Sequence, residues 1–350
     1  MSGSTLSIAG RPIGAGHPPY VICELSGNHN GSLERALAMV EAAAATGCDA
    51  IKLQTYTPDT ITLASDAPDF QITEGPWAGR TLHDLYAEAY TPYDWHAALF
   101  ERARQRGVTM FSTPFDATAV ELLEGLGAPA YKIASFEAVD LPLIARVAQC
   151  GKPMIISTGL ASLEEMGEAL QTAQANGAAG VALLHCVSAY PAPIDEANVR
   201  TVPDLAHRFG VVTGLSDHTP GSAAAVAAVA LGAAIIEKHF TLARADGGPD
   251  AAFSLEPAEF AAMTRDCKAA WSALGCATYD ELGSERAAAG HRRSLYVAAA
   301  VKAGEALTAA NVRSVRPGYG LAPKHLADVL GRKAARDLKF GEPLDWSMVD

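Results

Sequence analysis

Eight short β-rich runs alternate with longer helical patterns between residues 21 and 241, and this alternation constrains the fold more than any other feature of the sequence. The expected strands span residues 21–27, 50–56, 109–115, 130–136, 154–159, 180–186, 211–219 and 234–241. Several intervening helices are expected to end at glycine, as at Gly47, Gly107 and Gly177, because glycine readily adopts the left-handed cap conformation. Eight strands that each lead into a helix predict a (β/α)8 TIM barrel.

A doubly wound open sheet is the competing fold, but it usually has fewer strands and a glycine-rich first turn. The nearest match to that turn, at residues 125–130, precedes a strand instead of following one, so we reject it. After the last barrel helix, residues 276–290 are expected to form a linker. Residues 291–350 change character, with short strands, Gly/Pro turns and one helix near 323–329. We therefore predict an α/β fold with a barrel domain at 1–275 and a small domain at 291–350. The small domain is expected to dock on another surface, because a domain of this size is marginally stable alone.

Charge and composition exclude several classes of protein. The net charge is −12, from 39 acidic against 27 basic residues, and no basic cluster extends beyond Arg292–Arg293, so a nucleic-acid surface is not expected. No apolar run approaches the roughly 18 residues of a membrane span, and the N-terminus lacks a signal pattern. The six cysteines are scattered without a C-x-x-C pair and are expected to be reduced. The sequence therefore predicts a cytoplasmic protein without membrane segments.

Polar side chains follow every expected strand at its carboxyl end, which is where TIM barrels carry their active sites. In strand order, these groups lie at Glu24 to Gly31, Lys52 and Gln54, Ser112 to Asp116, Lys132 to Glu137, Ser157 to Gly159, His185 to Tyr190, Ser216 to His218, and Glu237 to His239. One such cluster could arise by chance. Eight at one end of a barrel predict a functional site.

Two lysines, Lys52 and Lys132, lie inside otherwise apolar strands. Each needs a negatively charged partner, because burying an unpaired ammonium group is costly. One interpretation is ion pairing with Glu24 or Glu137. The other is a clamp for the phosphate and carboxylate of a small phosphorylated acid. Hydroxyl donors for such a clamp are available at Ser112, Thr113, Ser135 and Ser157. Schiff-base chemistry is a rival use of a barrel lysine.

His218 and His239 end neighbouring strands, whose tips lie about 4.8 Å apart and can share one ion. Two histidines with water and substrate oxygens suit a labile divalent metal that acts as a Lewis acid. The absence of nearby acidic or cysteine ligands argues against a closed structural zinc site.

Three further features have two interpretations each. His29 either orients its loop or contacts a phosphate. Asp250, after Gly247–Gly248, either reaches a sugar hydroxyl or is a solvated turn carboxylate. The connection at 57–91 is too long for a simple barrel turn and is expected to form a lid or substrate wall. Aromatic residues in and after it, such as Tyr86 and Trp95, are expected mainly to pack it.

At these residues the sequence resembles the sialic acid synthase family. The matching motifs are ELSGNHNG at 24–31, KLQ at 52–54, STPF at 112–115, KIASFE at 132–137, STG at 157–159, the run 185–191, SDH at 216–218 and EKHF at 237–240. Residues 292–318 resemble the start of that family's antifreeze-like (SAF, β-clip) domain. The resemblance therefore covers nearly the whole chain and implies a TIM barrel followed by an SAF domain.

The resemblance implies condensation of phosphoenolpyruvate with an amino-sugar aldehyde. Residues 56–63 and 247–257 resemble the members that join phosphoenolpyruvate, 2,4-diacetamido-2,4,6-trideoxy-L-altrose and water to give pseudaminic acid and phosphate. Two alternatives remain. One is the same chemistry giving N-acetylneuraminate or legionaminate, and the other is a non-catalytic sugar-binding homologue.

The resemblance also implies roles for single residues. Phosphoenolpyruvate would be held by Lys52, Lys132, Ser135 and Ser157, assisted by Thr113 and Ser216. A Mn²⁺ or Mg²⁺ ion bound by His218 and His239 would polarise the sugar aldehyde. The catalytic candidates are Glu24, Glu137 and Lys52, and the sugar contacts would be Gln54, Tyr190 and Asp250. A homodimer with swapped C-terminal domains would add Arg293, with Arg292 as the alternative. Leu160 and Val187 depart from common family residues.

Overall fold

The computed structural model describes residues 4–75 and 77–350, and the chain divides into two compact units, Met1–Gly275 and Cys276–Asp350. The first unit contains a closed barrel of parallel strands in the order β10-β3-β4-β5-β6-β7-β8-β9. These strands are β3 (Tyr20–Glu24), β4 (Ala50–Thr55), β5 (Thr109–Pro114), β6 (Tyr131–Ile133), β7 (Pro153–Ser157), β8 (Gly180–Cys186), β9 (Val212–Asp217) and β10 (Ile235–His239). The predicted TIM barrel is confirmed.

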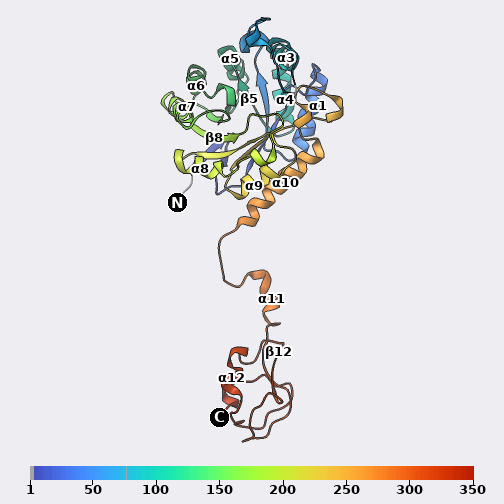
Figure 1. The fold of residues 1–350 in the computed structure, drawn as a ribbon, viewed down its shortest axis with the longest axis vertical. Helices are drawn as coiled ribbons and strands as arrows, with labels where there is room; N and C mark the ends of the chain where they lie inside the picture. Colours follow the sequence, from blue (N-terminus) through green and yellow to red (C-terminus); the bar gives the residue numbers. More distant parts are fainter. Residues whose placement is uncertain (1–3, 76) are drawn as a thin grey trace. The chain divides into compact units, whose positions relative to one another are not determined.

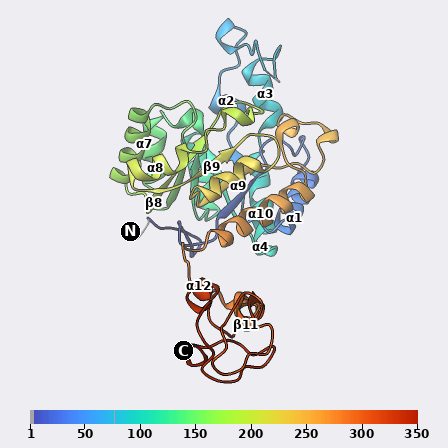
Figure 2. The ribbon, with the colours of Figure 1, turned by 60° about the horizontal axis from the view of Figure 1, so that its bottom comes forward.

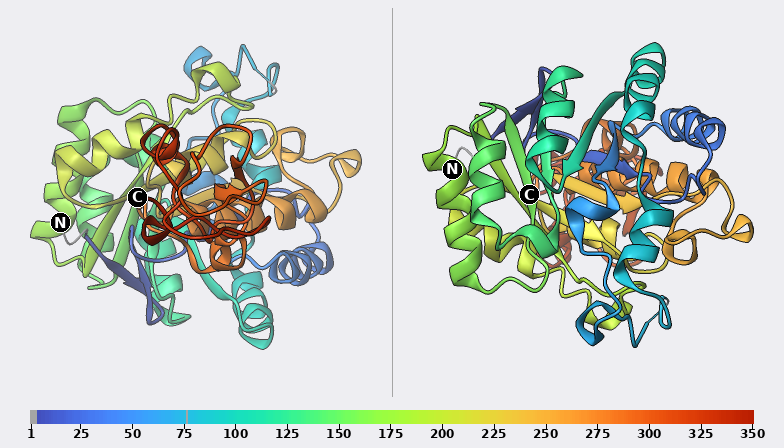
Figure 3. Two further views of the ribbon diagram at one scale, coloured as in Figure 1. Left: turned by 90° about the horizontal axis from the view of Figure 1, so that it is seen from below. Right: turned by 90° about the horizontal axis from the view of Figure 1, so that it is seen from above.

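Helices surround the barrel strands (Figures 1 and 3). They are α1 (Leu33–Ala45), α4 (His96–Gln105), α5 (Ala117–Gly125), α6 (Leu141–Ala148), α7 (Leu163–Ala175), α8 (Thr201–Phe209), α9 (Ala223–Ala230) and α10 (Pro257–Leu274). Side-chain caps fix where several of them begin. Ser32 accepts a hydrogen bond from the Arg35 amide, and Ser162 forms a reciprocal capping box with Glu165. Apolar residues between helices and strands form the largest core cluster.

The barrel interior is apolar at one end and polar at the other, because side chains on a strand alternate between its two faces. On β10, Ile235 belongs to the interior cluster and Ile236 to the cluster under the helices. Glu237 and His239 therefore share the interior face with Ile235, further along the strand. The same alternation places the polar ends of the other strands inside the barrel, at its C-terminal end.

A hairpin that the sequence analysis did not predict packs against the other end of the barrel. Strands β1 (Leu6–Ile8) and β2 (Arg11–Ile13) pair antiparallel before the first barrel strand. Leu6, Ile8 and Ile13 are buried in one cluster with inward-facing residues such as Tyr20 and Phe111. These apolar side chains close the N-terminal end of the barrel.

The long connection between β4 and α4 projects away from the barrel body (Figure 2). It contains α2 (Pro58–Ile61), the short 3₁₀ helices η1 (Pro68–Phe70) and η2 (Tyr93–Trp95), and α3 (Leu82–Ala89). Gln71 and Thr81 form an antiparallel bridge within it. Other 3₁₀ turns follow later barrel strands, at η3 (Ser135–Glu137), η4 (Ile194–Glu196), η5 (Arg244–Asp246) and η6 (Ala251–Phe253).

The second unit has its own small core. Strands β11 (Ser294–Val297) and β12 (Val312–Val315) pair antiparallel, and η8 (Pro323–His325) leads into α12 (Leu326–Val329), where one helix was expected. Its core cluster includes Leu295, Leu307, Val329 and Leu344. The expected linker at 276–290 contains η7 (Gly283–Glu285) and α11 (Arg286–Ala289), and η9 (Trp346–Met348) lies near the C-terminus. Within the described ranges, no helix is long and apolar enough to cross a membrane.

One ion pair is fully buried on the outer face of the barrel. The Lys238 ammonium lies 2.6 Å from an Asp217 carboxylate oxygen, and both side chains are almost completely inaccessible. Lys238 also donates a hydrogen bond to the carbonyl of Thr219, and Asp217 accepts one from the Thr219 amide. The pair therefore joins the ends of β9 and β10 next to His218 and His239.

Replacing Lys238 with methionine is expected to lower the free energy of unfolding by about 3–5 kcal/mol, because it leaves the Asp217 charge buried and unpaired. Urea unfolding at neutral pH measures the change. The exposed pair Arg208–Asp204 provides the control, and Arg208→Ala should change stability little. An equally small change for Lys238→Met would show that the buried pair contributes nothing to stability.

Candidate active site

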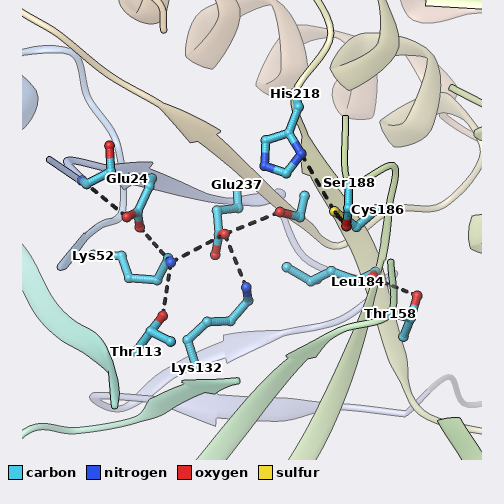
Figure 4. Close-up of polar contacts among 12 residues, drawn as sticks. Glu24, Lys52, Thr113, Lys132, Thr158, Leu184, Cys186, Ser188, His218 and Glu237 are labelled. Carbon is cyan, nitrogen blue, oxygen red and sulfur yellow. Dashed lines mark hydrogen bonds and ion pairs between the residues drawn. The ribbon is translucent and has the colours of Figure 1, made fainter. Parts of the chain in front are cut away.

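Two lysines and two glutamates form a charged floor inside the C-terminal half of the barrel (Figure 4). The Lys52 ammonium lies 2.6 Å from Glu24 Oε2 and 3.5 Å from Glu237 Oε1. The Lys132 ammonium lies 3.2 Å from the same Glu237 oxygen. All four side chains are at most 5% exposed. The name charged floor is kept below for Glu24, Lys52, Lys132 and Glu237.

The partners of the two lysines differ in part from those considered in the sequence. Ion pairing with Glu24 or Glu137 was the alternative to a phosphate clamp, but the carboxylate that both lysines share is Glu237. Glu137 instead lies in η3 and lines the cavity above the floor. Its Oε2 atom is buried and has no hydrogen-bond partner among the described residues. Glu137 is therefore available to a ligand, whereas Glu24 and Glu237 hold the lysines in place.

The electrostatics of the floor follow from burial and pairing together. Burial alone would lower the pKa of Lys52, but attraction to Glu237 and Glu24 outweighs it and the pKa is raised. Burial lowers the pKa of Lys132, because attraction to Glu237 is partly cancelled by repulsion from Lys52. Burial raises the pKa of Glu24. Attraction to Lys52 opposes this rise, and repulsion from Glu237 adds to it. With all four groups ionised, their formal charges cancel.

Hydroxyl groups surround the floor on several strands. Thr113 accepts a hydrogen bond from Lys52 at 3.1 Å, and Ser216 donates one to Glu237 at 3.3 Å. The Ser157 hydroxyl is buried and has no partner within the described part of the chain. Ser135 is buried against Gly159, where a Cβ would meet its hydroxyl oxygen at 2.9 Å. These donors suit an anion, and an unpaired hydroxyl such as that of Ser157 favours one.

His218 and His239 lie beside each other above the floor, with ring centroids 5.3 Å apart. The Nδ1 atom of His218 is 2.9 Å from the carbonyl oxygen of Val187, and that of His239 is 3.2 Å from the Ser26 hydroxyl. Such bonds fix ring orientation and leave Nε2 available to a ligand. Burial lowers the pKa of His239 well below its usual value, which keeps the ring in the neutral form that binds metals.

The donor set fits a divalent ion with open coordination positions. Over the described ranges, no group of three or more His, Cys, Asp or Glu side chains is arranged to hold a metal. Two imidazoles alone leave most positions of an ion to water and substrate, as a Lewis-acid role requires. Glu237 stands two residues before His239 on the same face of β10, and its Oε2 atom is buried without a partner among the described residues.

A cavity of about 640 Å³ lies at the C-terminal end of the barrel, and the expected sugar contacts line it. Gln54, Tyr190 and Asp250 are among its lining residues, together with Glu137 and His239. Asp250 does not behave as a solvated turn carboxylate. Burial raises its pKa, and its Oδ2 atom accepts a hydrogen bond from the Gly27 amide at 3.4 Å. The remaining lining residues are Tyr56, Ile61, Ile72, Glu74, Trp77, Leu82, Leu85, Tyr86, Ala89, Phe115, Ala134, Phe136, Ser188 and Pro249.

Two other candidates, His29 and Arg293, have contacts within their own units. His29 is buried, accepts a hydrogen bond from the Gly31 amide at 3.1 Å and packs edge-on against Trp95, which favours the loop-orienting interpretation. Arg293 belongs to the second unit, is exposed, and donates a hydrogen bond to the Ser314 carbonyl. Its proposed reach to a sugar remains a prediction.

Two residues of this region were not predicted from the sequence to have a role. Glu237 was noted at a strand end but given no role, although its spacing from His239 already placed both on one face. Trp77 was not singled out, because it lies in an irregular connection where no periodicity predicts which way a side chain points. It lines the cavity through a fold that only the tertiary structure reveals.

Comparisons with known proteins agree with this architecture. A model of the NeuB family matches residues 39–279, and a model of the SAF domain matches residues 292–350. The pseudaminic acid synthase of Campylobacter jejuni is 45% identical over 328 residues, which cover 93% of this chain and 95% of that protein. The pseudaminic acid synthase of Helicobacter pylori is 43% identical, with 93% and 96% covered.

A solved structure is similar as well. The N-acetylneuraminic acid (sialic acid) synthetase of Leptospira borgpetersenii, solved in complex with citrate, aligns with a TM-score of 0.73 at 29% sequence identity. The alignment covers 82% of this chain and 95% of that one.

Proposed function

The chain belongs to the NeuB family, and from this membership and the site we propose that it is a pseudaminic acid synthase. It would condense phosphoenolpyruvate with 2,4-diacetamido-2,4,6-trideoxy-L-altrose and water to give pseudaminic acid and phosphate. The observation that carries the chemistry is the buried pair Lys52 and Lys132 beneath two histidines whose Nε2 atoms are available. A purely structural barrel has no need of these groups.

Phosphoenolpyruvate would lie on the charged floor, with Lys52 and Lys132 facing its phosphate and carboxylate. Ser157, whose hydroxyl is buried and unpaired within the described ranges, would donate to the same ligand, together with Ser135 and Thr113. The formal charges of the floor already cancel without a ligand. A multiply charged anion in this buried place therefore needs further positive charge nearby.

We assign that charge to a divalent metal, Mn²⁺ or Mg²⁺, held by His218 and His239. When bound, the ion would supply Lewis-acid polarisation of the sugar aldehyde. The protein's own contribution is to orient both imidazoles through Val187 and Ser26, and burial keeps His239 neutral by lowering its pKa. It also excludes bulk water from the floor, which strengthens every interaction there.

The reaction would begin with attack of the enol carbon of phosphoenolpyruvate on the sugar aldehyde, which forms the new carbon–carbon bond. Water then adds to the resulting cationic carbon, and the tetrahedral intermediate expels phosphate. Lys52 and Lys132 stabilise the negative charge on the departing phosphate. Glu137 has a buried oxygen without a partner in the described structure and is our candidate to accept a proton, with Glu24 as the alternative.

Phosphate release from phosphoenolpyruvate in the presence of Mn²⁺ tests this proposal directly. The trideoxy-altrose sugar should support release, whereas N-acetylmannosamine and the legionaminate precursor should not. Release with one of the other sugars would retain the chemistry and change the product to N-acetylneuraminate or legionaminate. No release with any of the three would favour a non-catalytic sugar-binding protein.

The pH dependence of the reaction should report on Glu137. Burial raises its pKa to about 7, so it is protonated below that pH and ionised above it. If Glu137 accepts a proton, kcat/KM should rise as the pH increases through about 7, and Glu137→Gln should remove this rise. The exposed Glu164 provides the control, because Glu164→Gln should leave the profile unchanged. A rise that survives in Glu137→Gln would transfer the role to Glu24.

We also propose a homodimer in which each second unit covers the barrel of the partner and brings Arg293 to the sugar. Opposite charge supports this arrangement, since residues 276–350 carry eleven basic against nine acidic residues while the barrel unit is strongly acidic. Exposed apolar residues on the loops after barrel strands, among them Phe136, Leu160 and Ile194, add a suitable surface.

Mixing two inactive variants tests the exchange of second units. Arg293→Ala and His239→Ala are each expected to be inactive, but a mixed dimer would contain one site with both residues intact. After unfolding and refolding together, the mixture should regain activity in up to about a quarter of its sites. Lys132→Ala mixed with His239→Ala is the control, because every chain in that mixture has a defective barrel and no exchange of second units can restore a site. No recovery in the first mixture would disprove the exchange.

A further inference from the structure

The cavity wall contributed by the long β4–α4 connection has no role in the chemistry described above. From this connection the lining residues are Tyr56, Ile61, Ile72, Glu74, Trp77, Leu82, Leu85, Tyr86 and Ala89. All except Glu74 present mainly hydrocarbon or aromatic surface. The charged floor, the histidines and the polar sugar contacts come from other parts of the barrel. This wall therefore defines one side of the cavity by shape and by apolar character.

Trp77 links the wall to a second loop of the barrel. Its indole Nε1 atom donates a 2.8 Å hydrogen bond to the carbonyl oxygen of Pro249, 172 residues further along the chain. Pro249 and Asp250, in the loop after β10, line the same cavity. A half-buried donor bonded across such a sequence separation ties the irregular connection to a loop that carries an expected sugar contact.

The indole ring also joins the aromatic surface that leads down to the two histidines. Its centroid lies 5.7 Å from the ring of Tyr190. The Tyr190 ring lies 4.4 Å from His218 and 5.3 Å from Phe253, which in turn is 5.0 Å from His239. Trp77 thus stands at the outer end of a continuous row of rings, with His218 and His239 at its inner end.

An apolar wall discriminates among sugars because it offers no hydrogen-bond partner to a sugar hydroxyl. A hydroxyl pressed against it loses its bonds to water and gains none, whereas a methyl group gains favourable burial. A hydrophobic surface of this kind rejects a substrate that differs by one added hydroxyl by about 10²-fold. The wall therefore fits an amino sugar that presents a terminal methyl group and acetamido methyl groups on this side.

We propose that Trp77 is a specificity-determining residue that closes the apolar wall around the deoxy end of the sugar, held in position by its bond to Pro249. This proposal rests on the proposed function, because it assumes that the cavity binds an amino-sugar aldehyde. It assigns the selection of the sugar to the β4–α4 connection and not to the charged floor.

Two variants separate the two properties of the indole. Trp77→Phe keeps an aromatic ring but removes the donor to Pro249, and Trp77→Ala removes both. Trp271→Phe is the matched control, because the Trp271 indole is also half-buried and donates to a carbonyl, that of Ala15, away from the cavity. Thermal unfolding of each variant identifies any that fail to fold, and the milder Trp77→Phe change preserves most of the packing.

The measurement is kcat/KM for the trideoxy-altrose sugar and for the same sugar with a hydroxyl at C6, together with the KM for phosphoenolpyruvate. The wild-type preference for the deoxy sugar should fall about tenfold or more in Trp77→Ala and by less in Trp77→Phe. The KM for phosphoenolpyruvate should stay unchanged, as should every parameter of Trp271→Phe. If Trp77 had a purely structural role, its replacement would lower kcat/KM equally for both sugars. An unchanged preference would therefore overturn the proposal.

Failure of this inference can be told apart from failure of the proposed function. If the wild-type protein turns over the deoxy sugar but Trp77→Ala keeps its preference, only the role of Trp77 is wrong. If the wild-type protein releases no phosphate with either sugar, the proposed function and the inference fail together.

Discussion

Replacing His239 with alanine should lower kcat/KM by at least about 10³-fold, because Lewis-acid stabilisation is worth several kcal/mol and each 1.36 kcal/mol is a factor of ten. The side chain is buried, neutral and oriented by Ser26, so the fold already prepares it as a ligand. His218→Ala should have a similar effect. Mn²⁺ titration followed by electron paramagnetic resonance should show weakened binding in both variants, independently of turnover.

The control is a histidine of the same barrel end whose ring is already occupied. The Nε2 atom of His185 lies 2.8 Å from the carbonyl oxygen of Ala197, and the residue alternates with inward-facing Leu184 on β8. His185→Ala should therefore retain both Mn²⁺ affinity and turnover per folded molecule. Full activity or unchanged Mn²⁺ affinity in His239→Ala would remove the metal assignment.

Replacing Lys132 with alanine should raise the KM for phosphoenolpyruvate by about 10²-fold or more, since removing one partner of a buried charge pair in a complex costs about 2–5 kcal/mol of binding. Part of the effect arises because Glu237 loses one of its two cationic partners and repels the incoming anion more strongly. The KM for the sugar should change much less. Initial-rate kinetics with each substrate varied in turn separates the two effects.

The double variant Lys132→Ala/Glu237→Gln sharpens this test. If the two groups act as a pair, the combined effect on phosphoenolpyruvate should be smaller than the product of the single effects. The exposed Lys152, which pairs with Glu124 on the outside of the barrel, serves as control through Lys152→Ala. Unchanged kinetics in Lys132→Ala would contradict the clamp.

The sequence predicts the barrel well because burial on both faces leaves an unmistakable alternation of apolar strands and amphipathic helices. Its errors lie where local pattern is weak. The strand expected at 130–136 ends at Ile133, since the chain turns into η3 at Ser135. The β1–β2 hairpin was not predicted, because two strands of three residues offer too little periodicity to detect.

In the site, too, some features could be predicted from the sequence and others could not. Strand ends predict which residues gather at one end of a barrel, and Lys52, Lys132, His218 and His239 are buried together there. Which carboxylate each lysine contacts depends on side-chain reach across the barrel, and adjacency in sequence does not specify it. Glu237 is 105 residues from Lys132 and still its partner.

The closed N-terminal end of the barrel has a kinetic consequence. Leu6, Ile8 and Ile13 close that end of the barrel. In the described structure, both ligands would therefore enter and leave through the C-terminal end. Under the proposed function, phosphoenolpyruvate would lie on the charged floor, below the cavity that would hold the sugar. The two ligands would then bind in a compulsory order, with phosphoenolpyruvate first. Inorganic phosphate, formed at the bottom, would be trapped until the sugar acid departs, and sugar that arrives too early would slow turnover at high concentration.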